Sequence, residues 1–251
     1  MIVMKFGGTS VGNLEKMKHA ARIVLKEYIN GNSPLVVVSA MEKETDRLVS
    51  LVDTLTKENC PERDLIISTG ETVSTGLFAL TLNKIAKEEF SKQIQALALT
   101  SLQAGIEGSG PAGEGNIDSI NDTKLHALIN EGIIPVLPGF QCLKSTQLIT
   151  LGRGGSDTSA VVIGALLNAK RVYIYTDVDG VYNVDPRVHS DAIKYDRLEI
   201  EELIKLTESG AKVVHPKAAM FAKDRNVPLT IKSTFFPENA GTEILASGVI
   251  Q

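Results

Sequence analysis

Cysteine is scarce in this chain of 251 residues, which contains only Cys60 and Cys142. The two lie far apart, without a CxxC pair, so the sequence lacks both a zinc-ligand spacing and the cysteine density of a disulfide scaffold. The four histidines also show no metal-ligand spacing. We therefore expect two reduced thiols and no metal site built from these residues.

An excess of charge and a long apolar run are also missing. Lys and Arg total 26 against 30 for Asp and Glu, and no basic cluster follows one predicted helix, so nucleic acid is not expected as a partner. The N-terminal "MIVMKF" is charged by its fifth residue, and no apolar run approaches the roughly 20 residues of a membrane span. We expect a cytoplasmic protein without a membrane partner.

Short β-branched runs alternate with helical patterns such as residues 14–28, where apolar side chains recur every three to four positions. This alternation predicts an α/β fold, with a largely parallel sheet covered by helices on both faces. If there are two lobes, we expect the division near residue 150. The predicted strands are "MIVMKF", "PLVVVSA" (34–40), "QIQALAL" (93–99), "IIPVLPGF" (133–140), "RVYIYTD" (171–177) and "VPLTIKS" (227–233).

Local signals mark helix starts and one irregular segment. Asn13 is a predicted N-cap, and Asp122 is the predicted cap of a helix that begins near Thr123. The stretch "AGIEGSGPAGEGN" (104–116) is rich in glycine, which favours a mobile loop or hairpin over a phosphate cradle.

The first candidate site is "KFGGTS", where Lys5 ends a predicted strand and Gly7 and Gly8 precede a helix. Glycines let backbone N–H groups approach a ligand closely, and a lysine beside a helix N-terminus favours an anion. The order differs from that of a P-loop, in which the lysine follows the glycines. A tight turn with a solvated lysine is the alternative.

The second candidate is "TLGRGGSDTSA" (150–160), which again places a glycine pair before a helix. Arg153 offers a planar fork for a carboxylate or phosphate, and Asp157 adds an acid at the same place. A basic group and an acid on one glycine turn suggest a reacting centre. The alternative is an Asp157 that only caps its helix.

Three further stretches carry candidates. "YTDVDGVYNVDPR" (175–187) fails the EF-hand spacing, so we reject a calcium loop in favour of a nucleotide-holding loop. Glu71 lies in a segment predicted as a buried helix (65–82), so it either faces a pocket or is simply exposed. In "GAKVVHPKA" we expect His215 to be structural and Lys212 to be functional.

Taken together and in order, these motifs resemble the catalytic domain of the aspartokinases, within the wider amino acid kinase family. The resemblance extends from residue 3 to about 235 and rests on "KFGGTSV", "VVVSAM" with Thr45 and Asp46, "LIISTGETVST", "PGFQ", "TLGRGGSDTSA", "YTDVDGVYNVDPR", "GAKVVHPKA" and "VPLTIKSTF". It implies a three-layer αβα sandwich in which ATP phosphorylates the side-chain carboxylate of L-aspartate, the first step towards lysine, threonine and methionine.

The resemblance also implies a role for each site residue. Lys5, with Gly7 and Gly8, would stabilise the transferred phosphoryl group, and Asp157 would organise the cations. Arg153 would bind the α-carboxylate of aspartate. The other implied substrate-binding residues are Glu71 for the α-ammonium, Ser39, Thr45 and Ser156. The implied nucleotide-binding residues are Thr176, Asp177, Tyr182, Asp185, Arg187 and Lys212, with Mg²⁺ bound mainly by phosphate and water, and the implied assembly is a homodimer.

The sequence departs from the family pattern at three places. Glu42 replaces a glycine, and with Glu44 it would add negative charge near an anionic substrate. Cys142 replaces another glycine, which would alter the turn beneath the site. The chain also ends at "TEILASGVIQ" without the ACT domains that sense lysine or threonine, so we expect no feedback inhibition through them. Alternatives are a related kinase acting on another carboxylate and a catalytically silent nucleotide-binding subunit.

Overall fold

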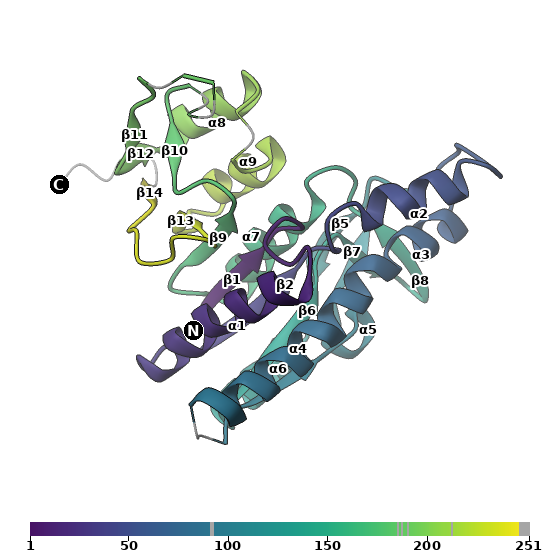
Figure 1. Ribbon diagram of the computed structural model, residues 1–251. Coiled ribbons are helices and arrows are strands. Elements are labelled where there is room, and N and C mark those ends of the chain that lie inside the picture. The colour runs from purple at the N-terminus through teal and green to yellow at the C-terminus, as the bar shows by residue number, and fades with distance from the viewer. Residues whose placement is uncertain (91–92, 185, 187, 190, 212, 246–251) are drawn as a thin grey trace.

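A computed structural model describes residues 1–90, 93–184, 186, 188–189, 191–211 and 213–245. Its main feature is an eight-stranded sheet whose neighbours are all parallel except one pair, which confirms the predicted fold class (Figure 1). All six predicted strands occur in it. In sheet order the strands are β12 (Arg197–Glu199), β14 (Thr242–Leu245), β13 (Leu229–Ser233), β9 (Val172–Thr176), β1 (Ile2–Phe6), β2 (Pro34–Val38), β6 (Ile133–Pro138) and β3 (Gln95–Ala98).

Helices cover both faces of this sheet, as predicted. Along β1 the side chains alternate: Met4 and Phe6 pack into a core with helices α1 and α4, whereas Val3 packs into a second core with α7. Lys5 shares the face of Val3, and this places it toward α7. The helices are α1 (Leu14–Ile29), α2 (Glu44–Val52), α3 (Pro61–Ile67), α4 (Thr69–Glu89), α5 (Ser101–Ala104), α6 (Asp122–Asn130), α7 (Gly155–Leu166), α8 (Ile200–Glu208) and α9 (Pro216–Asp224).

Two smaller sheets lie outside the main one. The first contains β5 (Asn116–Ser119), β4 (Glu107–Ser109), β7 (Gln141–Lys144) and β8 (Gln147–Thr150), and the second pairs β10 (Val181–Tyr182) with β11 (Lys194–Tyr195). Strands β4 and β5 pair antiparallel, so the glycine-rich stretch forms the predicted hairpin. Cys142 is buried within β7, where its Sγ lies 3.6 Å from the carbonyl of Asn116. Its thiol therefore packs inside this small sheet, not in the preceding turn.

One of the two helix caps is as predicted. The Asn13 side chain accepts a hydrogen bond from the Lys16 N–H at 2.9 Å at the start of α1. At α6 the cap is Asn121, which accepts from the Lys124 N–H at 3.0 Å, and Asp122 is the first helical residue. The prediction of Asp122 was wrong because asparagine and aspartate cap equally well, and the two are adjacent.

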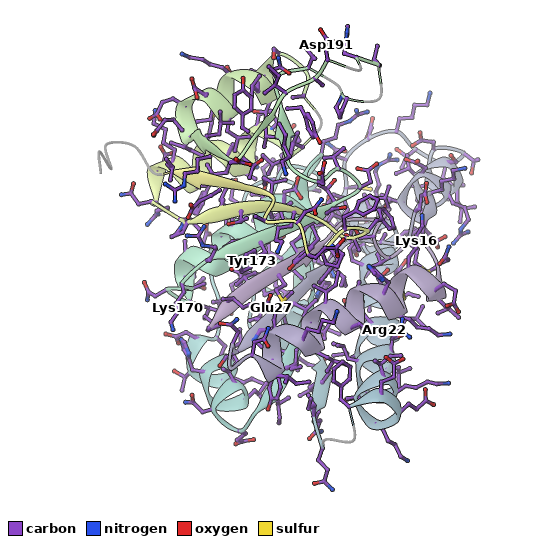
Figure 2. All side chains as sticks on the ribbon, turned by 60° about the vertical axis from the view of Figure 1, so that its left-hand side comes forward. Lys16, Arg22, Glu27, Lys170, Tyr173 and Asp191 are labelled. Atoms are coloured by element: carbon purple, nitrogen blue, oxygen red, sulfur yellow. The ribbon has the colours of Figure 1, made fainter. Side chains whose placement is uncertain are left out.

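Salt bridges hold α1 to its surroundings. Arg22 donates two hydrogen bonds to Glu89 at the end of α4, at 2.8 and 2.6 Å. One turn and a half earlier, the Lys16 ammonium lies 3.3 Å from a carboxylate oxygen of Glu42. Both basic residues lie along α1 (Figure 2). These partly exposed pairs orient the helix and contribute little to stability, because solvent screens their charges.

Helices α3 and α4 together contradict the expectation about apolar segments. Pro61–Glu89, 29 residues with a mean hydropathy of 1.4 over its most apolar window, is long and apolar enough to cross a membrane by length and composition. Half of that window is buried inside the protein. Phe78 and Leu82 belong to the core shared with α1 and β6, so the apolarity of α4 is that of a core helix.

Two helical glycines provide a matched test of this packing. In Gly164→Ala on α7 the new Cβ meets Val172 of β9, whereas in Gly76→Ala on α4 it meets nothing. We expect the first change to lower the free energy of unfolding by about 1–3 kcal/mol through overpacking. The second should raise it by about 0.5–1 kcal/mol, because alanine is the better helix former. Denaturant unfolding measures both, and effects of the same sign would contradict the packing described.

Candidate active site

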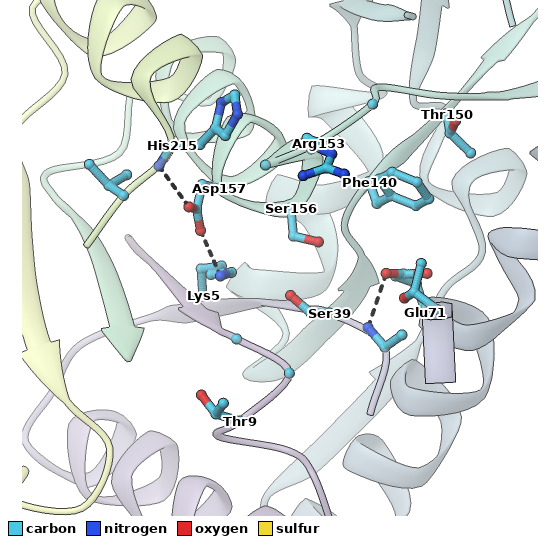
Figure 3. A pocket seen from close by; sticks show the side chains of 18 of the residues that line it. Lys5, Thr9, Ser39, Glu71, Phe140, Thr150, Arg153, Ser156, Asp157 and His215 are labelled. Carbon is cyan, nitrogen blue, oxygen red and sulfur yellow. Dashed lines mark hydrogen bonds and ion pairs between the residues drawn. The ribbon is translucent and has the colours of Figure 1, made fainter. Parts of the chain in front are cut away.

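A cavity of about 1280 Å³ opens at the carboxyl ends of the central strands (Figure 3). It lies where β1 pairs with β2 on one side and β9 on the other, the place where open α/β sheets bind ligands. Ten of the predicted site residues line it: Lys5, Gly7, Gly8, Ser39, Thr45, Glu71, Arg153, Ser156, Asp157 and Thr176. The fold thus brings together residues up to 171 positions apart.

Lys5 and Asp157 form an ion pair at the floor of the cavity. The Lys5 ammonium lies 2.6 Å from Oδ1 of Asp157, and only 8% of Lys5 is exposed. The alternative of a solvated lysine is therefore wrong. The other carboxylate oxygen of Asp157 accepts the His215 N–H at 3.0 Å (Figure 3). Gly154, not Asp157, is the N-cap of α7, so Asp157 compensates a buried cation instead of capping its helix.

The turn after Lys5 is fixed by its own backbone. The Gly7 N–H donates to the Tyr175 carbonyl at 3.3 Å, so it already has a protein partner. A Cβ on Gly8 would lie 3.1 Å from the carbonyl of Ala40, and glycine therefore permits the close approach. Further along, the buried hydroxyls of Ser10 and Thr234 are 2.6 Å apart. This bond joins the turn to the end of β13.

Glu71 is a buried acid that forms no salt bridge with a described residue. It is 3% exposed, and its Oε1 accepts the Ala40 N–H at 3.1 Å. Within the described residues Oε2 has no hydrogen-bond partner. Burial raises the pKa of this carboxyl to about 7. The alternative of an exposed glutamate is wrong, and a ligand that brings an ammonium group to Oε2 would satisfy it.

The Lys5–Asp157 pair and Glu71 lie on opposite sides of the view in Figure 3. The side chains of Ser39 and Ser156 lie between them. Arg153 is exposed on the turn before α7. Gly154 in that turn has a φ of +69°, and the His215 ring occupies the place where its Cβ would be. The cavity thus offers cations, one unpaired carboxylate oxygen and hydroxyls, a set suited to a small ligand carrying both signs of charge.

Glu42 and Glu44, the two acids near the site that the sequence analysis singled out, are both paired with basic side chains. Glu42 pairs with Lys16 on α1, and Glu44 accepts two hydrogen bonds from Arg47, at 2.9 and 2.7 Å. Each added negative charge therefore has a cation beside it. The expected repulsion of an anionic ligand is reduced accordingly.

Two of the predicted nucleotide-binding residues, Thr176 and Tyr182, line two neighbouring cavities, and Asp177 is in the lining of neither. Thr176 lines the first and donates to Asp177 at 3.1 Å. Tyr182 lines a second cavity of about 420 Å³, and its hydroxyl donates to Asp179 at 2.6 Å. Gly210, Ala211 and Val213 border both cavities. Asp185, Arg187 and Lys212 lie outside the described residues.

Sequence reasoning missed two residues that line the first cavity, Asp64 and Phe140. Asp64 lies seven positions before Glu71, and this spacing on a helical pattern could have indicated a shared face. Phe140 adopts a left-handed φ of +71°, which no sequence signal predicts. His215 caps α9 by accepting the Lys217 N–H at 3.3 Å; it is structural, as expected, and its own N–H also binds Asp157.

Comparison with known proteins places this site in a family. Residues 1–233 match the pattern of the amino acid kinase family. The chain belongs to the amino acid kinase family. It is 42% identical over 236 residues to an aspartokinase of Geobacillus stearothermophilus, covering 93% of this chain and 56% of that protein. The chain therefore spans little more than half the length of the curated relatives it matches.

Solved structures of family members superpose on nearly the whole chain. The crystal structure of aspartate kinase from Synechocystis has a TM-score of 0.82 at 37% identity, covering 99% of this chain and 40% of that one. E. coli aspartokinase III in complex with aspartate and ADP has a TM-score of 0.85 at 27% identity, covering 98% and 64%. The αβα architecture of the family is thus shared throughout.

The raised pKa of Glu71 predicts a pH-dependent stability. Between the ordinary pKa near 4.5 and the folded pKa of about 7, the folded state holds a proton that the unfolded state has lost, so stability falls as pH rises. We expect the wild type to lose roughly 1–3 kcal/mol relative to Glu71→Gln between pH 5 and 8. Urea unfolding of both proteins at several pH values measures this. Parallel pH profiles would show that Glu71 titrates normally.

Proposed function

We propose that this chain transfers the γ-phosphoryl group of ATP to the side-chain carboxylate of L-aspartate, forming 4-phospho-L-aspartate for lysine, threonine and methionine synthesis. The observation that carries the proposal is that one cavity contains both Lys5, a buried lysine suited to phosphate, and Glu71, a buried glutamate. The Oε2 of Glu71 has no hydrogen-bond partner among the described residues. Relatives named aspartokinase, and one solved in complex with aspartate and ADP, support this choice of substrate.

In this proposal the substrate binds through its three charged groups. Glu71 accepts the α-ammonium through Oε2, and Arg153 binds the α-carboxylate with its planar fork. The hydroxyls of Ser39, Thr45 and Ser156 complete the substrate side of the cavity. The β-carboxylate is left to face Lys5. It is ionised near pH 7 and therefore attacks without a general base.

Lys5 acts on the phosphoryl group while it is being transferred. Phosphoryl transfer requires alignment and cations where charge spreads over the equatorial oxygens. The ammonium of Lys5 would meet that charge, and Asp157 would hold the ammonium in place through their 2.6 Å contact. The carboxylate of Asp157 is in turn fixed by the His215 N–H.

The nucleotide side is assigned to residues 151–251, and the amino-acid side to residues 1–150. Thr176, Asp177 and Tyr182, with Asp185, Arg187 and Lys212, form the proposed nucleotide set. Mg²⁺ would arrive with ATP, bound by phosphate oxygens and water. A homodimer is the proposed assembly.

A trapping assay tests the reaction. Incubation with MgATP and hydroxylamine across aspartate, glutamate, acetylglutamate and uridylate should release ADP, and should form a hydroxamate, with aspartate alone. An acyl phosphate reacts with hydroxylamine, whereas a phosphate ester does not, so the hydroxamate identifies the carboxyl acceptor. Faster turnover of another acceptor would identify a different family activity. No turnover despite ATP binding would identify the silent nucleotide-binding alternative.

Loss of Lys5 should affect the chemical step. Lys5→Ala removes a contact that strengthens in the transition state, so kcat should fall by roughly 10² or more, with little change in the KM for ATP. Steady-state kinetics measure both constants, and the control is Lys18→Ala on α1, whose lysine pairs with Glu15 outside the cavity lining. A kcat near that of the wild type would remove Lys5 from the mechanism.

A further inference from the structure

Asp64 is a buried acid that the proposed chemistry does not use. It lies on α3, is 1% exposed, and lines the cavity. Its Oδ2 accepts the N–H groups of Gly113 at 2.8 Å and Thr150 at 2.7 Å, and its Oδ1 accepts the Thr150 hydroxyl at 2.8 Å. Within the described residues no basic side chain pairs with it. A carboxylate buried in this way depends on its hydrogen bonds, so these three donors and Asp64 fix one another.

Both partners of Asp64 border the turn that carries Arg153. Thr150 ends β8, and its carbonyl accepts the Gly115 N–H at 2.8 Å. The carbonyl of Gly113 lies 2.8 Å from the place where a Cβ of Gly152 would stand, and Gly152 has a φ of +75°. The turn at Gly152 is therefore held from the strand before it and from the loop packed against it.

Among the described residues, Asp64 is the only side chain of α3 that forms a hydrogen bond to Gly113 or Thr150. Arg153 itself is exposed, and it has no hydrogen bond or ion pair to another described residue. Its direction is thus set by the backbone that precedes it. That backbone is held by the Leu151 N–H, which donates to the Phe140 carbonyl at 2.9 Å, and at Thr150 and Gly113. The contacts of Thr150 and Gly113 both end on the single carboxylate of Asp64.

We propose that Asp64 is a positioning residue: it fixes the turn at Gly152 and thereby directs Arg153 toward the carboxylate of the amino-acid substrate. This inference rests on the proposed function for its substrate. Asp64 acts through Arg153 and takes no part in phosphoryl transfer. Its loss should therefore affect binding of the amino acid far more than the nucleotide or the chemical step.

Two substitutions at Asp64 separate geometry from charge. Asp64→Ala removes all the acceptors, and we expect the KM for aspartate to rise about tenfold, with kcat and the KM for ATP within about twofold. In Asp64→Asn the amide oxygen can accept both N–H groups, and its NH₂ can donate to the Thr150 hydroxyl. This variant should stay within about twofold of the wild type in all three constants.

Tyr28→Phe is the matched control. It removes the 3.0 Å hydrogen bond from the Tyr28 hydroxyl to the Gly132 carbonyl, distant from the cavity lining. This control should lower Tm and leave all three kinetic constants unchanged. If Asp64→Ala behaves in the same way, Asp64 is only structural and the inference is overturned. Should Asp64→Ala fail to fold, Thr150→Val removes one of the three bonds and should give a smaller rise in the same KM.

A double-mutant cycle tests the route through Arg153. Arg153→Lys retains the charge but loses the fork, so it should itself raise the KM for aspartate. If Asp64 acts by directing that fork, adding Asp64→Ala to Arg153→Lys should raise the KM much less than tenfold. Effects of the two substitutions that simply multiply would overturn the route.

Hydrogen exchange tests, independently of activity, whether the three hydrogen bonds of Asp64 hold the turn at Gly152. In the substrate-free protein, amides in a peptide spanning residues 146–155 should exchange faster in Asp64→Ala than in the wild type and Asp64→Asn. Unchanged exchange would overturn the inference whatever the substrate is. If the wild type fails to phosphorylate aspartate while this difference in exchange is observed, the proposed substrate is wrong, and the role of Asp64 in holding the turn is retained.

Discussion

The ion pair between Lys5 and Asp157 is the interaction on which the cavity depends. A lysine on the buried face of a central strand would be costly without a partner, because burial disfavours its charged form. The carboxylate 2.6 Å away permits this placement. Since Lys5 lies next to last in β1 and Asp157 lies in the first turn of α7, the pair also joins the sheet to the helix that carries Ser156 and follows the turn with Arg153.

The arrangement around this pair divides charge between two places. Lys5 and Asp157 neutralise each other at one end, whereas Glu71 at the other keeps one oxygen without a hydrogen bond from the described residues. The first place is ready to receive an anion that competes for the ammonium, and the second lacks a cation. A ligand that carries both signs of charge would complement both places.

Much of this could be predicted from the sequence, because the signals were local. The strands were predicted from β-branched runs, and the glycine turns after β1 and before α7 indicated the carboxyl edge of the sheet. What could not be predicted was the set of partners. That Asp157 meets Lys5, or that Asp64 meets Thr150, depends on contacts 152 and 86 residues apart in the chain. The predicted N-cap of α6, Asp122, was wrong by one residue because the neighbouring Asn121 caps equally well. The positive φ of Phe140 has no signature in the sequence.

The 2.6 Å contact between the Ser10 and Thr234 hydroxyls spans 224 positions of the chain. The Thr234 N–H also donates to the carbonyl of Thr176, at 2.9 Å. The turn that follows Lys5 therefore depends on a segment that is synthesised 224 residues after Ser10. During synthesis on the ribosome, the first strand and helix emerge long before this contact can form, so the turn attains its final geometry only after residue 234 has left the exit tunnel. The earliest part of the site to be synthesised is therefore completed only after the segment that follows β13.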